Sequence, residues 1–378
     1  MRIGILTGGG DTPSLNAILH GAAERAEELG HTLIGALRGW DGALNPIAYH
    51  EMNPRKINPN LGGTILKTSR TKLSDASMEQ AVRNIESKFD ALIAIGGDDT
   101  LTVGKDLGYL LNVPICFVTK TIDNDVGQNA PDGKVGYTEI INYFTSGFAT
   151  SAAKAVQYAA ELRTTAYSHE RVIFLETMGR TPGWLALSSY AGNPDFILVP
   201  EIPLDFEVFK KALADKYRIQ GNAVVVVAEG VKYTGSGALV AEDATNIDLF
   251  GHKKLGGASE ILAERIKNEL GITNSNAVNP SYLYRSGSPS EVDKRIGILL
   301  GREAVAAVSK KRTGEVAVVY RNDEGLRVRT MPVDEVLLTD ATGHIIPRNL
   351  DLRFYNPSTY SITPEGIEYF RPILNGGK

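Results

Sequence analysis

Short runs of apolar, mostly β-branched residues alternate along the chain with longer stretches in which apolar residues recur at helical spacing. Such runs are typical of buried strands, because a strand covered on both faces has no polar alternation. The pattern predicts strands at residues 3–6, 91–95, 114–118, 172–175, 196–199 and 223–228. Strands that alternate with helices form parallel sheets joined by crossover helices. We therefore predict an α/β protein.

Two amphipathic helices are predicted from apolar residues at intervals of three and four. One follows Pro13 and ends before Gly30, and the other covers residues 261–270 and ends before Gly271. Glycine is favoured after a helix because it adopts the left-handed conformation that terminates many helices. Residues 231–256 are richer in Gly, Thr and charged residues, and we predict that they form a surface loop.

Composition indicates an ordinary folded protein with enough residues for two domains. The chain has 378 residues, of which 43% are hydrophobic and 22% are charged, so two sizeable cores are expected. A net charge of -4 gives no basic footprint for nucleic acid. No apolar stretch approaches the ~20 residues that span a bilayer, and the N-terminus has no signal-peptide pattern. We expect a cytoplasmic protein with neither nucleic acid nor membrane as a partner.

The single cysteine, Cys116, lies between Ile115 and Phe117. One cysteine cannot form an intrachain disulfide, and apolar neighbours favour burial of the thiol in a core. A reducing compartment fits this pattern.

Two acidic loops directly follow predicted strands. Residues 96–100 read Gly-Gly-Asp-Asp-Thr, and residues 120–125 read Lys-Thr-Ile-Asp-Asn-Asp. In an open α/β sheet, ligands bind beyond the carboxyl ends of the strands. Glycines let the backbone approach phosphate oxygens, carboxylates hold hydrated Mg²⁺ or accept a hydroxyl proton, and lysine neutralises charge. The two loops therefore predict a phosphoryl-transfer site.

Two glycine-rich turns add weaker signals. Residues 7–14, Thr-Gly-Gly-Gly-Asp-Thr-Pro-Ser, join the first strand to the first helix, whose N-terminus favours an anion. This turn is neither a Walker A loop nor a dinucleotide fingerprint, and a tight turn capped by Asp11 is the alternative. The second turn, residues 62–70, ends in Arg70, whose guanidinium suits phosphate.

Taken in order, the motifs resemble those of the phosphofructokinase family. The matching segments are GGGDTPSLNA, GGTILKTSR, GGDDT, TKTIDND, Met178-Gly179-Arg180, and residues 199–203, 228–230 and 285–289. They span roughly residues 3–301, and no motif is assigned after Gly301. The resemblance implies two Rossmann-like α/β domains with mostly parallel sheets and an active site in the cleft between them. It also implies a homodimer or homotetramer.

The implied activity is magnesium-dependent transfer of phosphate to the 1-hydroxyl of fructose 6-phosphate, a glycolytic reaction. Residues 1–135 plus about 285–309 would bind the phosphoryl donor, and residues 136–284 plus about 310–378 would bind the sugar phosphate.

Residue roles follow from the same resemblance. Asp123, the first aspartate of TIDND, is the implied catalytic base, since a carboxylate can accept the hydroxyl proton as the bond to phosphorus forms. Asp98 is the implied Mg²⁺ ligand, and Asp125 orients the base or supports the metal shell. The remaining catalytic residues are Lys120, Thr121 and Arg180. The donor contacts are Gly9, Gly10, Arg70, Asp99, Thr100 and Lys120. The acceptor contacts are Thr121, Asp123, Arg171, Met178, Gly179, Arg180, Glu229, Tyr282 and Arg285. Solvated, turn-capping aspartates are the alternative for the acidic residues.

Asp99 and Lys120 bear on the phosphoryl donor. ATP-dependent relatives typically have glycine at both places, which leaves room for the α-phosphate of the nucleotide, so this pair resembles the pyrophosphate-dependent branch. Asp99 adds volume and negative charge where the α-phosphate would lie, while Lys120 can reach pyrophosphate. An ion pair between the two residues inside an ATP site is the alternative.

The acceptor end departs from the family pattern. Asn276 stands where the family has an arginine from a neighbouring subunit, and Tyr282 stands in place of a histidine. Tyr282 can still donate a hydrogen bond to the 6-phosphate, Arg285 supplies charge, and Arg171 matches another intersubunit arginine. Sedoheptulose 7-phosphate is therefore a second candidate acceptor.

Two competing interpretations concern other classes of protein. NAD kinase-like enzymes share a GGD loop but lack the combination of TIDND with Met178-Gly179-Arg180. A phosphometabolite-binding protein on the same fold has no need of both Asp98 and Asp123, because binding alone requires no base.

Overall fold

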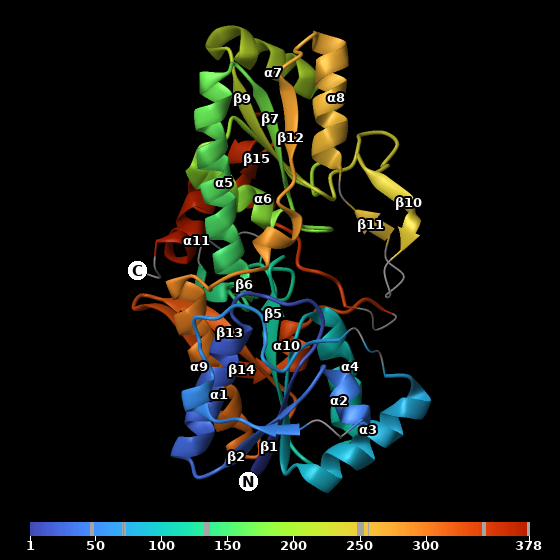
Figure 1. Cartoon of the computed structure of the whole chain (residues 1–378), viewed down its shortest axis with the longest axis vertical. Helices are drawn as coiled ribbons and strands as arrows, with labels where there is room; N and C mark the ends of the chain where they lie inside the picture. Colours follow the sequence, from blue (N-terminus) through green and yellow to red (C-terminus); the bar gives the residue numbers. More distant parts are fainter. Residues whose placement is uncertain are drawn as a thin grey trace. The chain divides into compact units, whose positions relative to one another are not determined.

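The computed structural model describes residues 1–45, 49–69, 71, 73–131, 137–247, 253–255, 257–341 and 345–375, with the backbone alone at 75, 242–247 and 253–255. The chain divides into two compact units (Figure 1). Unit 1 comprises Met1–Thr150 and Arg285–Arg348, together with Asn375. Unit 2 comprises Ser151–Tyr284 and Asn349–Leu374.

A single large sheet forms the centre of unit 1. Its strands are β1 (Arg2–Thr7), β2 (Thr32–Ala36), β3 (Tyr49–Glu51), β4 (Ala91–Gly96), β5 (Ile115–Thr121), β6 (Ser146–Gly147), β13 (Glu315–Asn322) and β14 (Gly325–Pro332). The order is β14-β13-β5-β4-β1-β2-β3, and β6 pairs with β5. Only β3 and β14, at the two edges of the order, run antiparallel to their neighbours. The order reverses at β1, which makes the carboxyl ends of β1 and β4 a topological switch point, where ligands bind in such sheets.

The helices of unit 1 pack on this sheet. They are α1 (Leu15–Glu28), α2 (Trp40–Leu44), α3 (Asp75–Lys88), α4 (Asp98–Leu110), α9 (Glu291–Ser309) and α10 (Val333–Val336), with the 3-10 turns η1 (Pro54–Lys56) and η2 (Tyr137–Glu139). Helices α1 and α9 pack closely because glycines lie between them. A Cβ atom on Gly301 would lie 2.0 Å from the carbonyl oxygen of Ile18, so a larger residue there would push the helices apart.

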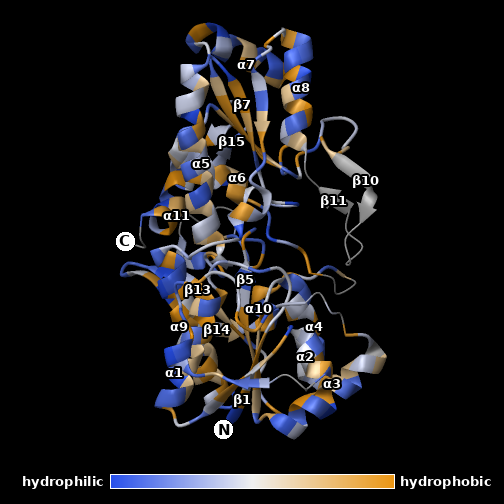
Figure 2. Cartoon of the chain, in the orientation of Figure 1, coloured by the Kyte–Doolittle hydropathy of each residue, from blue (hydrophilic) through white to orange (hydrophobic). Residues whose placement is uncertain are grey.

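Unit 2 is built on a parallel sheet of order β12-β7-β9-β8. The strands are β7 (Val172–Thr177), β8 (Phe196–Leu198), β9 (Ala223–Ala228) and β12 (Ser275–Val278). Its helices are α5 (Phe148–Ser168, which begins in unit 1), α6 (Trp184–Ser188), α7 (Phe206–Gln220), α8 (Ala258–Leu270) and α11 (Pro364–Leu374), with η3 (Ser189–Gly192), η4 (Ser281–Tyr284) and η5 (Leu352–Phe354). Hydrophobic residues follow the strands, whereas α5, α7 and α8 carry alternating hydrophobic and hydrophilic bands (Figure 2).

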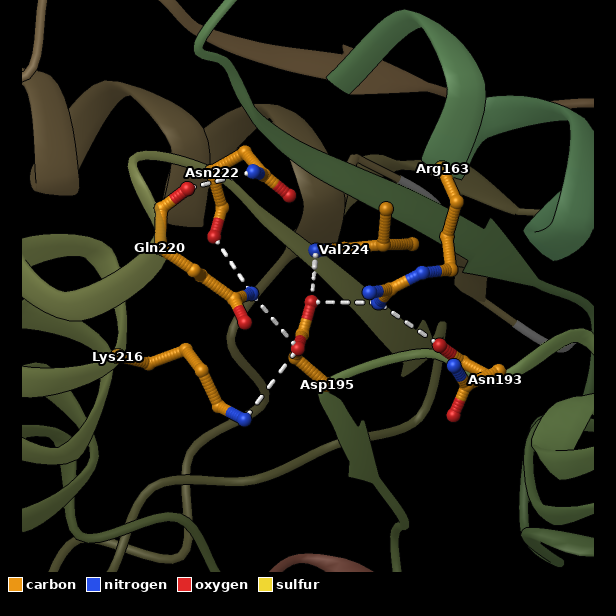
Figure 3. A network of polar contacts seen from close by, with 7 residues as sticks. All are labelled: Arg163, Asn193, Asp195, Lys216, Gln220, Asn222 and Val224. Atoms are coloured by element: carbon orange, nitrogen blue, oxygen red, sulfur yellow. Dashed lines mark hydrogen bonds and ion pairs between the residues drawn. The ribbon is translucent and has the colours of Figure 1, made fainter. Parts of the chain in front are cut away.

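A buried carboxylate ties together the segments beside the amino end of β9 (Figure 3). Asp195, whose side chain is 5% exposed, lies 2.9 Å from Arg163 of α5 and 3.5 Å from Lys216 of α7. It also accepts hydrogen bonds of 2.9 Å from Gln220 Nε2 and from the Val224 backbone N–H. Each carboxylate oxygen therefore has two donors, and the network serves to join α5, α7 and β9.

The predicted strands and both predicted helices are confirmed. Helix α1 ends before Gly30, and α8 is followed by Gly271 in the left-handed conformation. The prediction of a loop over residues 231–256 is wrong in part, since β10 (Glu242–Ile247) and β11 (Lys253–Leu255) form an antiparallel pair there. Their Lys, Asp, Glu and Asn residues are depleted in strands, so only the backbone pairing reveals them. A second antiparallel pair, β15 (Tyr355–Asn356) and β16 (Ser361–Ile362), was also not predicted.

The compact units differ from the predicted domain boundaries at two places. Residues 137–150, 310–341 and 345–348 lie in unit 1 and not with the second domain. The physical reason is backbone pairing: β6 and β13 both hydrogen-bond to β5, and β14 pairs with β13. The α/β class with mostly parallel sheets is confirmed.

Two further predictions concern the burial of Cys116 and the presence of membrane-spanning helices. Cys116 is fully buried in β5, as predicted, and burial raises the pKa of its thiol far above the ordinary value. Among the described helices, none combines the length and apolar character needed to cross a membrane.

Candidate active site

The turns that follow β1 and β4 meet around Thr100. A Cβ atom on Gly8 would lie 2.5 Å from Thr100 Oγ1, and one on Gly96 would lie 2.2 Å from Thr100 Cβ. Such contacts leave no room for side chains, so glycine is required at both places. The backbone of Gly9 has φ of +75°, a conformation that also favours glycine. The sequence therefore brings the first glycine-rich turn against the GGDDT loop, as the resemblance implies.

The second glycine-rich segment lies against the first. Thr68 Oγ1 donates to the Gly9 carbonyl oxygen at 2.5 Å, and the Gly9 N–H donates to the Ser69 carbonyl oxygen at 3.3 Å. Thr7 Oγ1 donates to the Lys67 carbonyl oxygen at 2.8 Å. Arg70, the predicted phosphate contact of this segment, lies outside the described residues.

Lys120 is a buried cation at the end of β5. Its side chain donates through Nζ to the carbonyl oxygen of Gly10, and the residue is 3% exposed. Burial and the nearby Arg285 guanidinium lower the pKa of Lys120 to about 8, against the opposing attraction of Asp11, Asp125 and Asp98. The predicted donor residues Gly9, Gly10, Thr100 and Lys120 thus lie around one turn.

Asp98 and Asp99 begin helix α4. The Asp99 backbone N–H donates to Asp98 Oδ1 at 2.8 Å. Asp98 is half-buried, and its charge acts on both Lys120 and Asp125. Asp99 is exposed. Asp98 therefore lies within electrostatic reach of the TIDND loop, as a shared metal site requires.

The TIDND loop carries its chemistry on one face. Thr121, Asp123 and Asp125 are half-buried, while Ile122, Asn124 and Val126 are buried. Thr121 Oγ1 accepts the Asp123 backbone N–H at 3.1 Å, and its hydroxyl also bonds the Asp125 carboxylate. The structure thus groups the predicted base with its predicted supports.

Negative charge accumulates on this face. Burial, Asp123 and Asp98 together raise the pKa of Asp125 to about 8, although the bond from Thr121 acts in the opposite direction. Asp125 Oδ1 is buried and has no hydrogen-bond donor among the described residues. A buried acceptor without a donor, beside two further carboxylates, fits a bound cation.

The donor set suits Mg²⁺ better than a metal enclosed entirely by protein. Within the described part of the chain, no three carboxylate, imidazole or thiol side chains converge as a metal cage. Mg²⁺ usually keeps several waters and binds through one or two carboxylates plus substrate phosphates. The Asp98 carboxylate and the buried Oδ1 of Asp125 are oxygen donors of this kind, so they fit Mg²⁺.

In unit 2, four predicted acceptor residues lie together at the carboxyl ends of β7 and β9. The Gly179 N–H donates to Glu229 Oε1 at 3.3 Å. A Cβ atom on Gly230 would lie 2.0 Å from the Arg180 carbonyl oxygen, so the two turns are in contact. Met178 precedes Gly179, whose backbone φ of +130° sets the path of the turn.

Three other predicted acceptor residues lie elsewhere. Arg171 precedes β7 and donates to Thr165 Oγ1 at 3.4 Å, so it lies at the opposite end of that strand from Arg180. Tyr282 lies in η4 and is 69% exposed. Arg285 belongs to unit 1, where a Cβ atom on Gly10 would lie 3.2 Å from its Nη1. Arg285 therefore lies beside the donor turn.

Sequence motifs did not reveal Arg348 and Asn142. Both are buried. Arg348 bonds the Asn124 carbonyl oxygen of the TIDND loop, and Asn142 bonds the carbonyl oxygen of Val126, which directly follows the loop. Each is a single polar residue in a segment without a recognisable spacing, so no local signal marks them.

Comparison with known proteins identifies the family of this chain. Residues 2–308 match the family described as phosphofructokinase. The chain belongs to the phosphofructokinase family. The family predicted from the ordered motifs is thereby confirmed.

Some relatives that resemble the chain along nearly its whole length are named as pyrophosphate-using enzymes, and others are named as ATP-dependent enzymes. The pyrophosphate–fructose 6-phosphate 1-phosphotransferase of Dictyoglomus thermophilum is 38% identical over 364 residues, which cover 94% of this chain and 96% of that protein. The ATP-dependent 6-phosphofructokinase of Chloroflexus aurantiacus is 33% identical over 359 residues, 91% of this chain and 92% of that protein.

The same phosphofructokinase fold occurs in solved structures. The pyrophosphate-dependent phosphofructokinase of Nitrosospira multiformis has a TM-score of 0.82 at 20% identity and covers all of this chain and 92% of that one. At 20% identity, this likeness shows the fold alone and does not identify the phosphoryl donor.

Proposed function

We propose that this protein transfers a phosphoryl group from pyrophosphate to the 1-hydroxyl of fructose 6-phosphate, in a reversible, magnesium-dependent glycolytic reaction that yields fructose 1,6-bisphosphate and phosphate. The observation that carries the proposal is Lys120 at the donor turn, taken together with Asp99 in the first turn of α4. Lys120 Nζ lies on the Gly10 carbonyl, where it can attract the small pyrophosphate anion. Asp99 presents a carboxylate on α4, which opposes a nucleotide α-phosphate.

Asp123 has the role of general base. It accepts the proton of the sugar 1-hydroxyl while the hydroxyl oxygen forms its bond to phosphorus. The P–O bond to the departing phosphate breaks, and that oxygen keeps the electron pair. Thr121 holds the Asp123 backbone N–H at 3.1 Å, which fixes the start of the loop that carries the base.

Asp98 is the proposed Mg²⁺ ligand, and Asp125 supports the metal shell. When bound, Mg²⁺ neutralises charge on the phosphate oxygens. Lys120 contributes further positive charge beside Gly10, so the residues around the turn offset the charge that pyrophosphate brings.

The sugar phosphate is assigned to the turns of unit 2. Arg180 supplies charge to the acceptor, and Glu229, which orients Gly179, suits a sugar hydroxyl. Arg171 and Arg180 flank opposite ends of the six-residue strand β7, so they lie on the order of 20 Å apart along it. Arg171 therefore suits the acceptor site of another copy, which favours a homodimer or homotetramer. A cytoplasmic location accords with a glycolytic role.

A direct assay tests the proposal. Purified protein is given fructose 6-phosphate and MgCl₂ with either pyrophosphate or ATP, and fructose 1,6-bisphosphate is measured. We expect turnover with pyrophosphate, little with ATP, and loss of activity in EDTA. Parallel reactions use sedoheptulose 7-phosphate or NAD as the acceptor, and Asp123→Asn provides the background rate.

The outcomes separate the alternatives. Turnover with ATP and none with pyrophosphate overturns the donor assignment. Faster transfer to sedoheptulose 7-phosphate overturns the acceptor, and transfer to NAD supports the NAD kinase-like alternative. Binding of sugar phosphate without transfer from either donor contradicts the enzymatic role.

A further inference from the structure

The TIDND loop is held from its buried side through its backbone. The Thr121 carbonyl oxygen accepts from Thr145 Oγ1 at 2.7 Å. The Asp125 carbonyl oxygen accepts from the Arg348 backbone N–H at 2.7 Å, and the Val126 carbonyl oxygen accepts from Asn142 Nδ2 at 2.8 Å. These donors come from segments that follow the loop by at least 16 residues. The path of the loop is therefore set by tertiary contacts.

Arg348 makes the largest share of these contacts. Its guanidinium is buried, with the residue 2% exposed. Nε and Nη2 donate to the Asn124 carbonyl oxygen at 3.0 and 2.9 Å, and Nη2 also donates to Asn124 Oδ1. Nη1 donates to the Asn142 carbonyl oxygen at 2.6 Å. A planar group with fixed donor directions thus joins two backbone segments, which a lysine ammonium cannot reproduce.

Asn124, whose carbonyl oxygen Arg348 bonds, lies in the chain between the two catalytic carboxylates. Asn124 has φ of +59°, a left-handed conformation that asparagine tolerates better than other residues with a Cβ atom. Its Oδ1 also accepts the Thr145 N–H at 3.0 Å. Such a conformation persists where the surrounding structure over-determines it. Here it directs Asn124 inward, and its neighbours Asp123 and Asp125 occupy the half-buried face.

Asn142 connects this arrangement to the central sheet. Its Nδ2 donates to Thr119 Oγ1 of β5 at 3.2 Å, and its Oδ1 accepts the Val319 N–H of β13 at 3.2 Å. Gly127 leaves space for the guanidinium, since a Cβ atom there would lie 3.0 Å from Arg348 Nη1. The loop is thereby fixed to the strands through Asn142 and Arg348.

From these contacts we infer that Arg348 is a positioning residue, which acts through the Asn124 backbone to hold the Asp123 and Asp125 carboxylates in their reactive places. This inference rests on the proposed function for its catalytic consequence. Carboxylates that share a small site repel one another, so the loop needs a rigid backbone to keep them together. Displacement of a reacting group by about 1 Å costs roughly 100-fold in rate.

The kinetic test uses Arg348→Lys and Arg348→Met. We expect kcat to fall by about 10- to 100-fold, with the KM values for pyrophosphate and sugar phosphate changed less than about threefold, because the ligand-contacting side chains remain. The fall should be smaller in Arg348→Lys, which keeps the charge. The matched control is Arg312→Met, since Arg312 bonds Thr330 Oγ1 at 2.8 Å and pairs with Glu315 at the amino end of β13. The control should lower thermal stability and keep kcat.

A double-mutant cycle distinguishes positioning from simple destabilisation. If Arg348 acts through Asp123, Arg348→Met should cause little further loss in an Asp123→Asn background, because the base it positions has already gone. An equal fold-loss in both backgrounds overturns the inference. Wild-type kcat in folded Arg348→Met also overturns it.

Hydrogen exchange provides a measurement that needs no turnover. The backbone amides of residues 121–127 should exchange faster in Arg348→Lys and Arg348→Met than in the wild type or Arg312→Met. Unchanged exchange overturns the inference. Faster exchange in the two Arg348 variants, found together with a wild-type protein that transfers no phosphate, supports the backbone role of Arg348 and counts against the proposed function alone.

Discussion

Asp195 and Asp125 are acidic residues with buried carboxylate oxygens and opposite surroundings. Asp195, in unit 2, receives donors from Arg163, Lys216, Gln220 and the Val224 backbone (Figure 3). Asp125, in unit 1, has one buried oxygen without a donor among the described residues, and the neighbouring charges of Asp123 and Asp98 raise its pKa. The first carboxylate has its charge offset within the chain, while the second lacks part of that compensation.

The difference separates a structural carboxylate from a reactive one. A carboxylate with a full set of donors gains little from a ligand, because its hydrogen bonds are already made. A carboxylate with an unfilled acceptor and like-charged neighbours is stabilised by a cation or a proton. Both residues have a buried carboxylate oxygen, so the number and charge of the partners is the informative property.

The largest expected effect comes from replacing a carboxylate of the TIDND loop by an amide, with the same replacement at Asp195 for comparison. Asp123→Asn should reduce kcat by about 10²–10⁴-fold, since the amide has nearly the same shape but cannot accept the proton. Steady-state kinetics with pyrophosphate measure the loss, while substrate KM and thermal unfolding should change little.

Asp195→Asn is the matched control for Asp123→Asn. It should lower thermal stability and leave kcat per folded molecule unchanged. Activity of Asp123→Asn within a few-fold of wild type would remove Asp123 from the role of base.

Replacement of Lys120 or Asp99 is expected to have the next largest effect on the kinetics. Lys120→Gly should lower kcat/KM for pyrophosphate by about 10- to 100-fold, because a charge-assisted contact is worth roughly 1.5–3 kcal/mol. Asp99→Gly should admit ATP by removing volume and negative charge. Kinetics with both donors, in each single variant and in the double variant, measure the preference. Unchanged donor preference in the double variant contradicts the proposed roles of the pair.

Removal of the structural carboxylate should have a smaller effect, confined to stability. Asp195→Ala leaves the Val224 N–H and Gln220 without their acceptor, which should cost about 1–3 kcal/mol. Arg163 and Lys216 are partly exposed, so water can solvate them and limit the loss. Thermal and urea unfolding measure the change. A large fall in kcat for the folded variant would show that this network has a further role.

A further expected effect is on the pH dependence of stability. Asp125 has a pKa of about 8 in the folded protein, against an ordinary value of 3.8. The folded state therefore holds a proton that the unfolded state has lost, and this contribution to stability decreases as the pH rises from about 4 to 8. Thermal unfolding in EDTA from about pH 5 to 8 should follow this decrease, and Asp125→Asn should reduce it.

Thermal unfolding with added Mg²⁺ tests the same carboxylate over the same range of pH. The metal binds the ionised carboxylates and competes with the proton, so its stabilising effect should increase towards pH 8. Lys120, whose pKa is lowered to about 8, contributes a rise in stability only above that pH. Burial also raises the pKa of Glu176, Glu201 and Asp293, so the difference between wild type and Asp125→Asn isolates the contribution of Asp125. A stabilisation by Mg²⁺ that is equal at all pH values, or equal in Asp125→Asn, contradicts the proposed metal site.

Local pattern was sufficient for much of the fold and part of the site. The apolar runs identify β1, β4, β5, β7, β8 and β9, and helical spacing followed by glycine identifies α1 and α8. The order of the glycine-rich and acidic loops predicts the family and brings Gly9, Thr100 and Lys120 to one turn. These features are visible in sequence because strand burial, helical periodicity and the backbone freedom of glycine depend on neighbouring residues.

Tertiary structure alone decided which distant groups act on those loops. It assigns β13 and β14 to unit 1 through pairing with β5, places Arg171 and Arg180 at opposite ends of β7, and brings Arg348 onto Asn124 from 224 residues away. The same holds for charge, since the contrast between Asp125 and Asp195 comes from burial and from partners on other elements. A residue type sets the ordinary pKa and the number of hydrogen bonds available, whereas the folded surroundings set which of these bonds are made and what each charge costs.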